Sequence, residues 1–200
     1  MNKQKLTDMV LLSLFSAIII ILALIPGIGY IPLGVTRATT IHIPVIIGSI
    51  LLGPKKGGIL GGVFGLTSLL TNTFMPTITS FVFSPFYSGG NFWSLVICFV
   101  PRILTGVIPY FIFNLFNKTK VKHAALFVAG FAGSITNTLL VMNMIYIFFG
   151  SQYAAAKSIT TGLYSVIIGV IGINGTIEAI VAAILTSAIC SVLIKLNRKG

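Results

Sequence analysis

The sequence predicts an all-α integral membrane protein with six transmembrane helices and both termini in the cytoplasm. Three observations support this prediction. The composition is 56% hydrophobic and only 8% charged, whereas a soluble domain is usually about 25% charged. Long apolar runs recur, most of them near the ~20 residues that cross a bilayer. Lysines gather between alternate runs, as they do in cytoplasmic loops. No linker or second domain is apparent, so we interpret residues 1–200 as a single domain.

The first three apolar runs are bounded by turns that contain glycine and proline. The first covers 7–25 and ends at Pro26-Gly27. No small-residue cleavage site follows it, so we interpret it as an uncleaved helix rather than a signal peptide. The second covers 40–53 and is short for a bilayer unless it begins near residue 36. The third covers 59–74, and its glycines have the spacing that lets a neighbouring helix approach closely, which favours a contact within the chain.

The last three apolar runs are longer. Residues 92–116 form the fourth run, which contains an arginine and two prolines. The fifth covers 124–149 and follows the basic turn NKTKVKH. The sixth covers 163–196, too long for one perpendicular helix, so we expect it to tilt or to begin outside the membrane.

Lysine and arginine positions predict the orientation of these helices. With six spans, ten of the 13 basic residues fall on one side, at positions 3, 5, 55, 56, 118, 120, 122, 195, 198 and 199. The other side has Arg37 and Lys157. Cytoplasmic loops carry the excess of basic residues, so both termini are predicted to be cytoplasmic. The connections 26–39, 75–91 and 150–162 then face outward, and loops of such length are often functional.

The composition also excludes several classes of function. The net charge of +11 is spread in short clusters between apolar runs, a pattern of membrane topology rather than of nucleic-acid binding. The sequence has no nucleotide-binding G-x-x-x-x-G-K-[ST] motif and no H-E-x-x-H zinc motif. Cys98 and Cys190 lie inside apolar runs without disulfide or metal spacing. With Asp8 and Glu178 as the only acidic residues, no catalytic carboxylate pair exists. We therefore predict no enzymatic activity and no cofactor or metal.

Arg102 is the leading candidate for a binding residue. It lies near the middle of the fourth run, and an ionisable residue inside the membrane is a functional hypothesis by default. Its guanidinium presents a fork that matches a carboxylate. The alternative is a structural ion pair with Glu178, near the middle of the sixth run, and both interpretations remain open.

Two prolines flank the arginine. Pro101 and Pro109 cannot donate a backbone hydrogen bond, so the carbonyls of Ile97 and Thr105 lose their usual donors. In lipid those carbonyls need other partners. A kinked helix beside a polar cavity satisfies this requirement, and a kink that serves packing alone is the alternative.

Amide and imidazole side chains add further candidates. Asn137 lies midway along the fifth run, at the predicted depth of Arg102. His42 lies at the outer end of the second run. Asparagines in membrane helices also serve as interhelical hydrogen-bonding groups, so ligand contact and a structural role are both open for these residues.

Residues 40–70, TIHIPVIIGSILLGPKKGGILGGVFGLTSLL, resemble the second and third helices of the substrate-binding S components of energy-coupling-factor (ECF) vitamin transporters. The six-span plan is similar as well, so the resemblance covers nearly the whole chain. The segments SFVFSPF and PRILTGVIPYFIFN are most similar to the pantothenate-specific members. Members of the hydroxymethylpyrimidine type are also close. The resemblance implies an S-component bundle, of the riboflavin-transporter-like type, in a bacterial cell membrane.

The family resemblance implies a mechanism and partners. An S component binds a vitamin from outside, associates with a transmembrane coupling subunit and two cytoplasmic ATPases, and topples in the membrane to deliver its ligand inward. Small residues on the first helix, typically alanines, meet the coupling subunit in this family. Ser13 and Ala17 occupy that place here, and the serine is a departure from the pattern. Loops 26–39 and 75–91 would cover the ligand. A self-sufficient secondary transporter is the alternative mechanism.

Pantothenate is the favoured ligand, and hydroxymethylpyrimidine or another vitamin is the alternative. Pantothenate has one carboxylate, two hydroxyls and an amide. We expect Arg102 to take the carboxylate, and Asn137, Asn91 and His42 to serve the hydroxyls and amide. Glu178 is either a further site residue or the partner of Arg102. The aromatic side chains expected to close over the gem-dimethyl group are Phe83, Phe86, Tyr87 and Trp93.

The predicted topology can be tested with single cysteines. A cysteine at position 118 or 199 should react with a membrane-impermeant thiol reagent only after the membrane is opened, because both positions lie on the lysine-rich side. The native chain is the control, since Cys98 and Cys190 lie within apolar runs. Labelling of either position in intact cells would contradict the predicted orientation.

Overall fold

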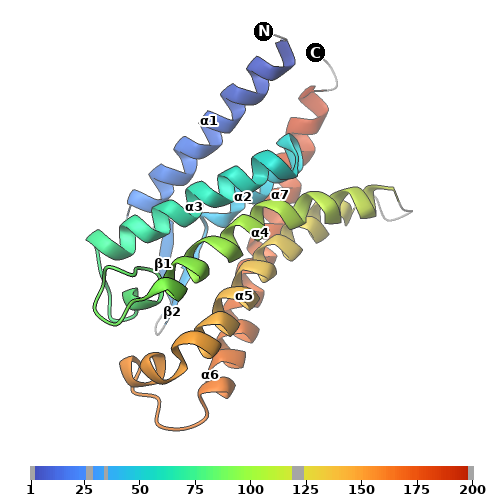
Figure 1. Ribbon diagram of the computed structural model, residues 1–200. Helices are drawn as coiled ribbons and strands as arrows, with labels where there is room; N and C mark the ends of the chain where they lie inside the picture. The colour runs from blue at the N-terminus through green and yellow to red at the C-terminus, as the bar shows by residue number, and fades with distance from the viewer. Residues whose placement is uncertain (1–2, 26–28, 34–35, 119–123, 198–200) are drawn as a thin grey trace.

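The computed structural model describes residues 3–25, 29–33, 36–118 and 124–197. Six helical segments follow one another in these ranges, at the positions that the apolar runs predict (Figure 1). They are α1 (Lys3–Leu24), α2 (His42–Leu52), α3 (Pro54–Phe74), α4 (Phe92–Asn117), α5 (Ala125–Ala156), and a last segment in which α6 (Leu163–Val170), the π-helical turn η3 (Ile171–Gly175) and α7 (Thr176–Asn197) are continuous.

Four stretches within the described ranges are long and apolar enough to cross a membrane. These are Gln4–Leu24, Phe92–Asn117, Ala125–Ala156 and Leu163–Leu196. α2 is apolar but has 11 residues. α3 has 21 residues and begins with Pro54 and two lysines.

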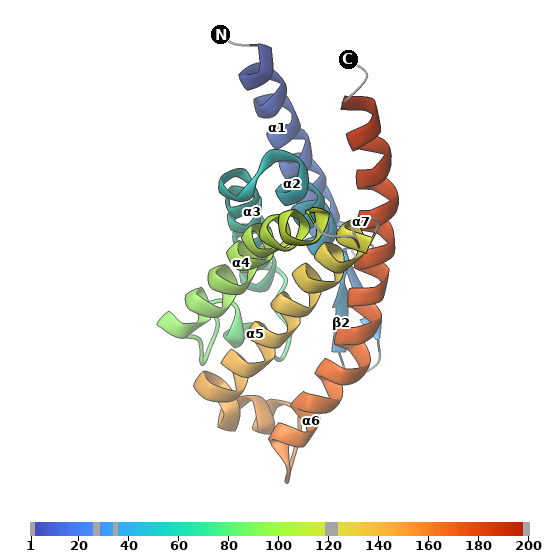
Figure 2. The same cartoon turned by 90° about the vertical axis from the view of Figure 1, so that its right-hand side faces the viewer.

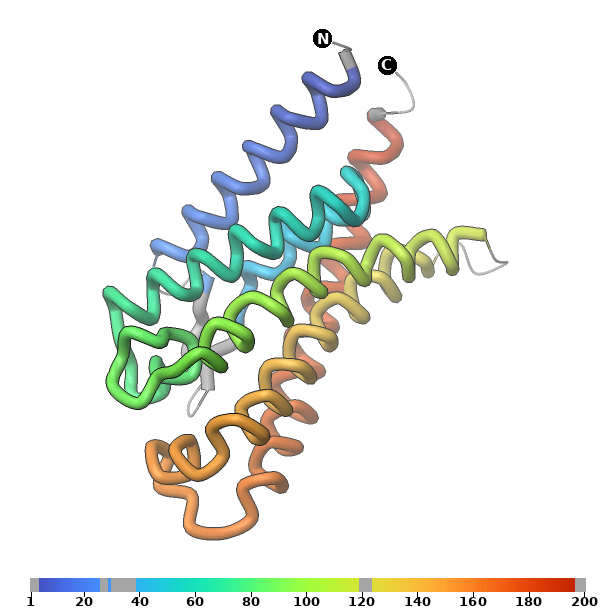
Figure 3. Tube along the Cα trace, in the orientation of Figure 1, coloured from blue at the N-terminus to red at the C-terminus, as the bar shows by residue number. Residues whose placement is uncertain are grey.

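The beginning of α1 and the end of α7 lie at the same end of the bundle. Figures 1 and 2 show the beginning of α1 near the end of α7, with the turn between α2 and α3 on the same side. Lys56 of α3 forms an ion pair with Asp8 of α1 at this end. The predicted cytoplasmic residues at 120, 122, 198 and 199 lie outside the described residues. The connection 75–91 and the segment between α5 and α6 lie at the opposite end, as the tube in Figure 3 shows.

The connection 26–39 contains a short β-hairpin, which the sequence pattern does not indicate. Strands β1 (Tyr30–Leu33) and β2 (Thr36–Thr39) pair antiparallel, with the first residue of β1 opposite the last of β2. The Thr40 N–H donates to the Gly29 carbonyl at 3.0 Å and closes the base of the hairpin. This connection is therefore an ordered element where it is described.

The connection 75–91 is held by hydrogen bonds around a 3-10 turn, η1 (Ser80–Val82). The Ser80 hydroxyl donates to Asn72 Oδ1 of α3 at 2.9 Å. The Ser94 hydroxyl of α4 donates to the Phe81 carbonyl at 2.7 Å. These bonds tie the loop to both helices that it connects, so it is a fixed cap on this end of the bundle.

α5 extends beyond the predicted run. Residues 150–156, expected to form part of a connector, are helical, and Phe149 has non-helical angles of φ −132° and ψ 16°. The last turns of α5 therefore continue past a kink, and the connection to α6 begins later than the polar sequence suggests.

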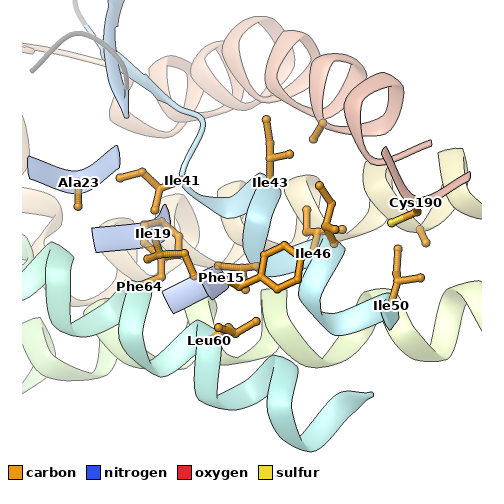
Figure 4. Packing of buried hydrophobic residues seen from close by; sticks show 14 residues of the cluster. Phe15, Ile19, Ala23, Ile41, Ile43, Ile46, Ile50, Leu60, Phe64 and Cys190 are labelled. Carbon is orange, nitrogen blue, oxygen red and sulfur yellow. The ribbon is translucent and has the colours of Figure 1, made fainter. Parts of the chain in front are cut away.

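The short helix α2 is at the centre of the bundle. Its residues from His42 to Ile50 are all buried, and it contacts α1, α3, α4, α5 and α7. Figure 4 shows Ile46 of α2 among Phe15 of α1 and Leu60 of α3. A helix that is apolar on nearly all sides is buried by its neighbours, which agrees with the central position of α2.

Two glycines allow α3 and α4 to touch through their backbones. A Cβ atom at Gly57 would overlap the carbonyl oxygen of Gly106, and the reverse holds for Gly106. One turn further along α3, a Cβ at Gly61 would overlap the carbonyl oxygen of Arg102. The glycine pattern of the third run thus serves a contact within the chain, as predicted, and it sets the position of the arginine-bearing turn.

We expect Gly57→Ala to destabilise the protein, because the methyl group has no space at this crossing. Overpacking of this kind costs about 1–3 kcal/mol. Gly62→Ala is the matched control, since a Cβ there meets no heavy atom within 4 Å, and its higher helix propensity should leave stability unchanged or increased. Thermal unfolding in detergent measures both variants, and equal midpoints would contradict the proposed backbone contact.

Candidate substrate-binding site

A cavity of about 460 Å³ lies among α3, α4, α5, the α6–α7 segment and the connection 75–91. Small-molecule sites usually have volumes of roughly 300–1,000 Å³, so this cavity has the size of a ligand site. Its polar and charged lining residues include Thr39, Ser68, Asn72, Arg102, Asn137, Thr138, Tyr153, Lys157, Asn174 and Glu178.

Arg102 lies on the wall of this cavity with 6% of its surface exposed. Its Nη1 donates to the Ile97 carbonyl at 2.7 Å. This is the carbonyl whose usual donor Pro101 removes, so the arginine supplies the missing hydrogen bond. Arginine and proline therefore act together: the proline opens the helix, and the guanidinium satisfies the carbonyl that becomes available.

Two phenylalanine rings fix the guanidinium further. Its central carbon lies 5.4 Å from the ring centroid of Phe64 and 4.9 Å from that of Phe83. A cation over an aromatic face at these distances is attracted to the ring quadrupole. Phe83 also lines the cavity, so the capping loop contacts the charged group directly.

Asn137 of α5 lines the same cavity and is buried. Within the described part of the chain, its Oδ1 has no hydrogen-bond partner. A buried acceptor without a donor costs about 1–3 kcal/mol. A ligand hydroxyl or amide N–H placed at this oxygen would recover that free energy.

Glu178 of α7 joins the cavity wall to the hairpin. Its Oε1 accepts a hydrogen bond from the Thr39 N–H at 3.1 Å, and Thr39 is the last residue of β2. Both residues line the cavity. The carboxylate thus holds one end of the hairpin against the bundle.

The remaining predicted site residues lie apart from the cavity lining. Asn91 caps α4, and its Oδ1 accepts from the Trp93 N–H at 2.9 Å. His42 is buried within α2. Tyr87 packs against the apolar cluster around Phe81 and Phe149.

Of the predicted site residues, the structure brings four together in the cavity lining: Arg102, Asn137, Phe83 and Glu178.

The other two predicted aromatic residues also lie outside this lining. The Trp93 ring stacks on Phe148, with ring centroids 4.0 Å apart and planes at 8°. Phe86 is largely exposed. These rings belong to the outer surface of the bundle.

Sequence reasoning missed several lining residues. On α3, Asn72 donates from Nδ2 to the Ser68 carbonyl at 2.8 Å, and both residues line the cavity. The four-residue spacing of Ser68 and Asn72 near the end of this helix was a usable signal. Tyr153 and Lys157 are brought to the cavity by the kinked end of α5, which no sequence pattern indicates.

The small residues of α1 point away from the bundle. Ser13 and Ala17 are exposed. Phe15 and Ile19 of the same helix are buried and face α2 and α3, as Figure 4 shows. The outer face of α1 is therefore accessible to another helix.

Comparison with known proteins gives consistent matches along the chain. The family model described as "ECF transporter, substrate-specific component" matches residues 7–190. The chain is 41% identical over 202 residues to the pantothenic acid transporter PanT of Lactococcus lactis subsp. cremoris (strain MG1363), with 98% of this chain and 97% of the relative covered. It is 32% identical over 210 residues to the pantothenate transporter PanT of Leuconostoc mesenteroides subsp. mesenteroides, with 100% and 98% covered.

These matches extend over almost the entire chain, and both relatives are transporters. Together with the apolar helices, they identify a multi-pass bacterial membrane protein that is a transporter rather than an enzyme. The chain belongs to the family of substrate-specific components of ECF transporters.

Proposed function

We propose that this chain binds pantothenate from outside the cell and delivers it inward as the substrate-specific subunit of an ATP-driven ECF importer. The observation that carries the proposal is the buried Arg102 on the wall of a cavity of ligand size. The names of the two relatives agree with this ligand.

The cavity offers complementary groups for each part of pantothenate. A guanidinium has five N–H donors, so Arg102 can hold the Ile97 carbonyl and a ligand carboxylate at the same time. Asn137 Oδ1 can accept from a hydroxyl or the amide. The lining residues Phe83, Val141 and Ile145 provide apolar contacts for the gem-dimethyl group.

Glu178 has a second role in this proposal. One of its oxygens holds the Thr39 N–H, and the other can accept a hydrogen bond from a ligand hydroxyl. The same carboxylate would then bind the ligand and hold the hairpin against the bundle.

We further propose a single domain of six spans with both termini cytoplasmic. The placement of the beginning of α1, the end of α7 and the α2–α3 turn at one end of the bundle supports this arrangement. The cavity would then open to the outside, since the connection 75–91 forms part of its lining.

The proposed partners are a transmembrane coupling subunit and two cytoplasmic ATPases. The chain has no nucleotide-binding loop, so the energy must come from other subunits. The exposed Ser13 and Ala17 provide a face that a partner helix can approach closely.

Arg102→Ala should lower pantothenate affinity sharply. The change removes one partner of a buried charged contact, which costs roughly 2–5 kcal/mol, or about 30-fold to several thousand-fold in affinity. Arg102→Lys should restore only part of the loss, because an ammonium lacks the planar fork. Titration calorimetry on the purified protein measures both variants.

Pantothenol, which has a hydroxyl in place of the carboxylate, is the control ligand for this experiment. It should bind the unaltered protein poorly and lose little further affinity in Arg102→Ala. This comparison separates ligand contact from folding, because Arg102 also bonds the Ile97 carbonyl. Equal losses for the two ligands would show that the arginine is structural and that the carboxylate lies elsewhere.

Replacing both Ser13 and Ala17 with Leu should reduce uptake while pantothenate affinity stays unchanged. Larger side chains block the approach of a partner helix, and neither residue lines the cavity. Proteoliposomes with the coupling subunit and ATPases measure uptake. Ala188→Leu, a change at an exposed position of α7, is the matched control.

Two results of the proteoliposome experiment would count against this assignment. Unchanged assembly and uptake in the double variant would place the coupling face elsewhere. Accumulation of pantothenate against a gradient by the chain alone would contradict the need for partners and favour a self-sufficient transporter.

A further inference from the structure

Lys157 places a second cationic side chain on the wall of the cavity that contains Arg102. It is partly buried and follows Tyr153, another lining residue, by one helical turn. Arg102 lies in the interior of α4, whereas Lys157 comes from the end of α5 at the outer end of the bundle (Figure 1). The two cations therefore occupy different depths of one site.

The fold fixes the position of Lys157. At the kink, the buried Phe149 ring packs against Phe81 of the capping loop with centroids 5.7 Å apart. The Lys157 N–H donates to the Tyr153 carbonyl at 3.1 Å, and Ser158 stops the helix with a φ of 54°. The lysine is thus presented by an anchored helix end rather than by a free loop.

Lys157 and Arg102 differ in exposure, since Lys157 is partly buried and Arg102 is buried. Among the described lining residues Glu178 is the third charged one, and the others, among them Met75, Thr77, Ile78, Thr79 and Tyr153, are neutral. A partly exposed charge at the rim of a site acts mainly on the association rate and its salt dependence. A buried charge such as Arg102 acts mainly on the dissociation rate.

We propose that Lys157 captures the anionic substrate at the mouth of the cavity and that Arg102 retains it. Lys157 would then set how fast a carboxylate ligand enters, and Arg102 how slowly it leaves. This inference rests on the proposed function, because it requires a ligand with a carboxylate.

Stopped-flow measurements at several ionic strengths test these separate roles of Lys157 and Arg102. They give the association and dissociation rates of pantothenate. The protein is held in nanodiscs of zwitterionic lipid, so that the membrane adds no net surface charge. The variants are Lys157→Gln, Lys157→Arg, and Lys195→Gln as the matched control at the other end of the bundle.

Lys157→Gln should lower the association rate about two- to fivefold at low ionic strength and flatten its dependence on salt. The dissociation rate should stay the same. Lys157→Arg keeps the charge and should behave as the unaltered protein, as should Lys195→Gln.

Two kinds of result would overturn the inference. If Lys157→Gln changes the unfolding temperature but no rate, the lysine only stabilises the end of α5. If the dissociation rate rises while the association rate stays the same, Lys157 is a retaining contact. Absence of pantothenate binding by the unaltered protein would overturn the proposed function as well, whereas normal binding with an unchanged association rate in Lys157→Gln overturns the inference alone.

Discussion

The hydrogen bond from Arg102 to the Ile97 carbonyl is the interaction on which the site depends. Inside a membrane every backbone carbonyl needs a donor, because no water is available. Pro101 removes one such donor, and the adjacent arginine replaces it at 2.7 Å. This bond lets a proline occupy the middle of α4, and it holds the guanidinium on the cavity wall. The guanidinium charge, which would be costly in lipid, is thereby hydrogen-bonded to the backbone of its own helix.

Close helix contacts determine where the cavity lies. α3 and α4 touch through Gly57 and Gly106, and again where Gly61 meets the carbonyl of Arg102. Nearer its C-terminal end, α3 carries Ser68 and Asn72 in place of the contacting glycines, and these residues line the cavity. One helix therefore packs tightly along one part of its length and forms a polar wall along the next.

The two connections that are predicted to face outward are held in different ways. Connection 75–91 is tied to α3 and α4 by hydroxyl groups, which keep Phe83 near the arginine. The hairpin is joined to α7 through the Glu178 carboxylate, which also lines the cavity. The cavity thus has a fixed cap on one side and, on the other, a hairpin held by a lining residue.

The sequence by itself determined the helices and the leading candidate for a site residue. A bilayer requires long apolar helices with internal hydrogen bonds, so composition and run length were enough to place all six helical segments. The same constraint singled out Arg102, because a charge within an apolar run needs a structural or functional reason. The distribution of lysines likewise predicted that both termini lie on one side of the membrane, and the structure places the beginning of α1 and the end of α7 at the same end of the bundle.

Only the tertiary structure decided which polar side chains meet. The kink at Phe149 brings Lys157 to the cavity, and the hairpin places Thr39 beside Glu178. Asn91 instead caps α4, and His42 is a buried residue at the beginning of the central helix α2. Helix formation in a membrane follows from local composition, whereas the meeting of side chains depends on the angles and close contacts between helices far apart in the sequence. Those angles come from packing of the whole bundle, so no single segment of the sequence specifies them.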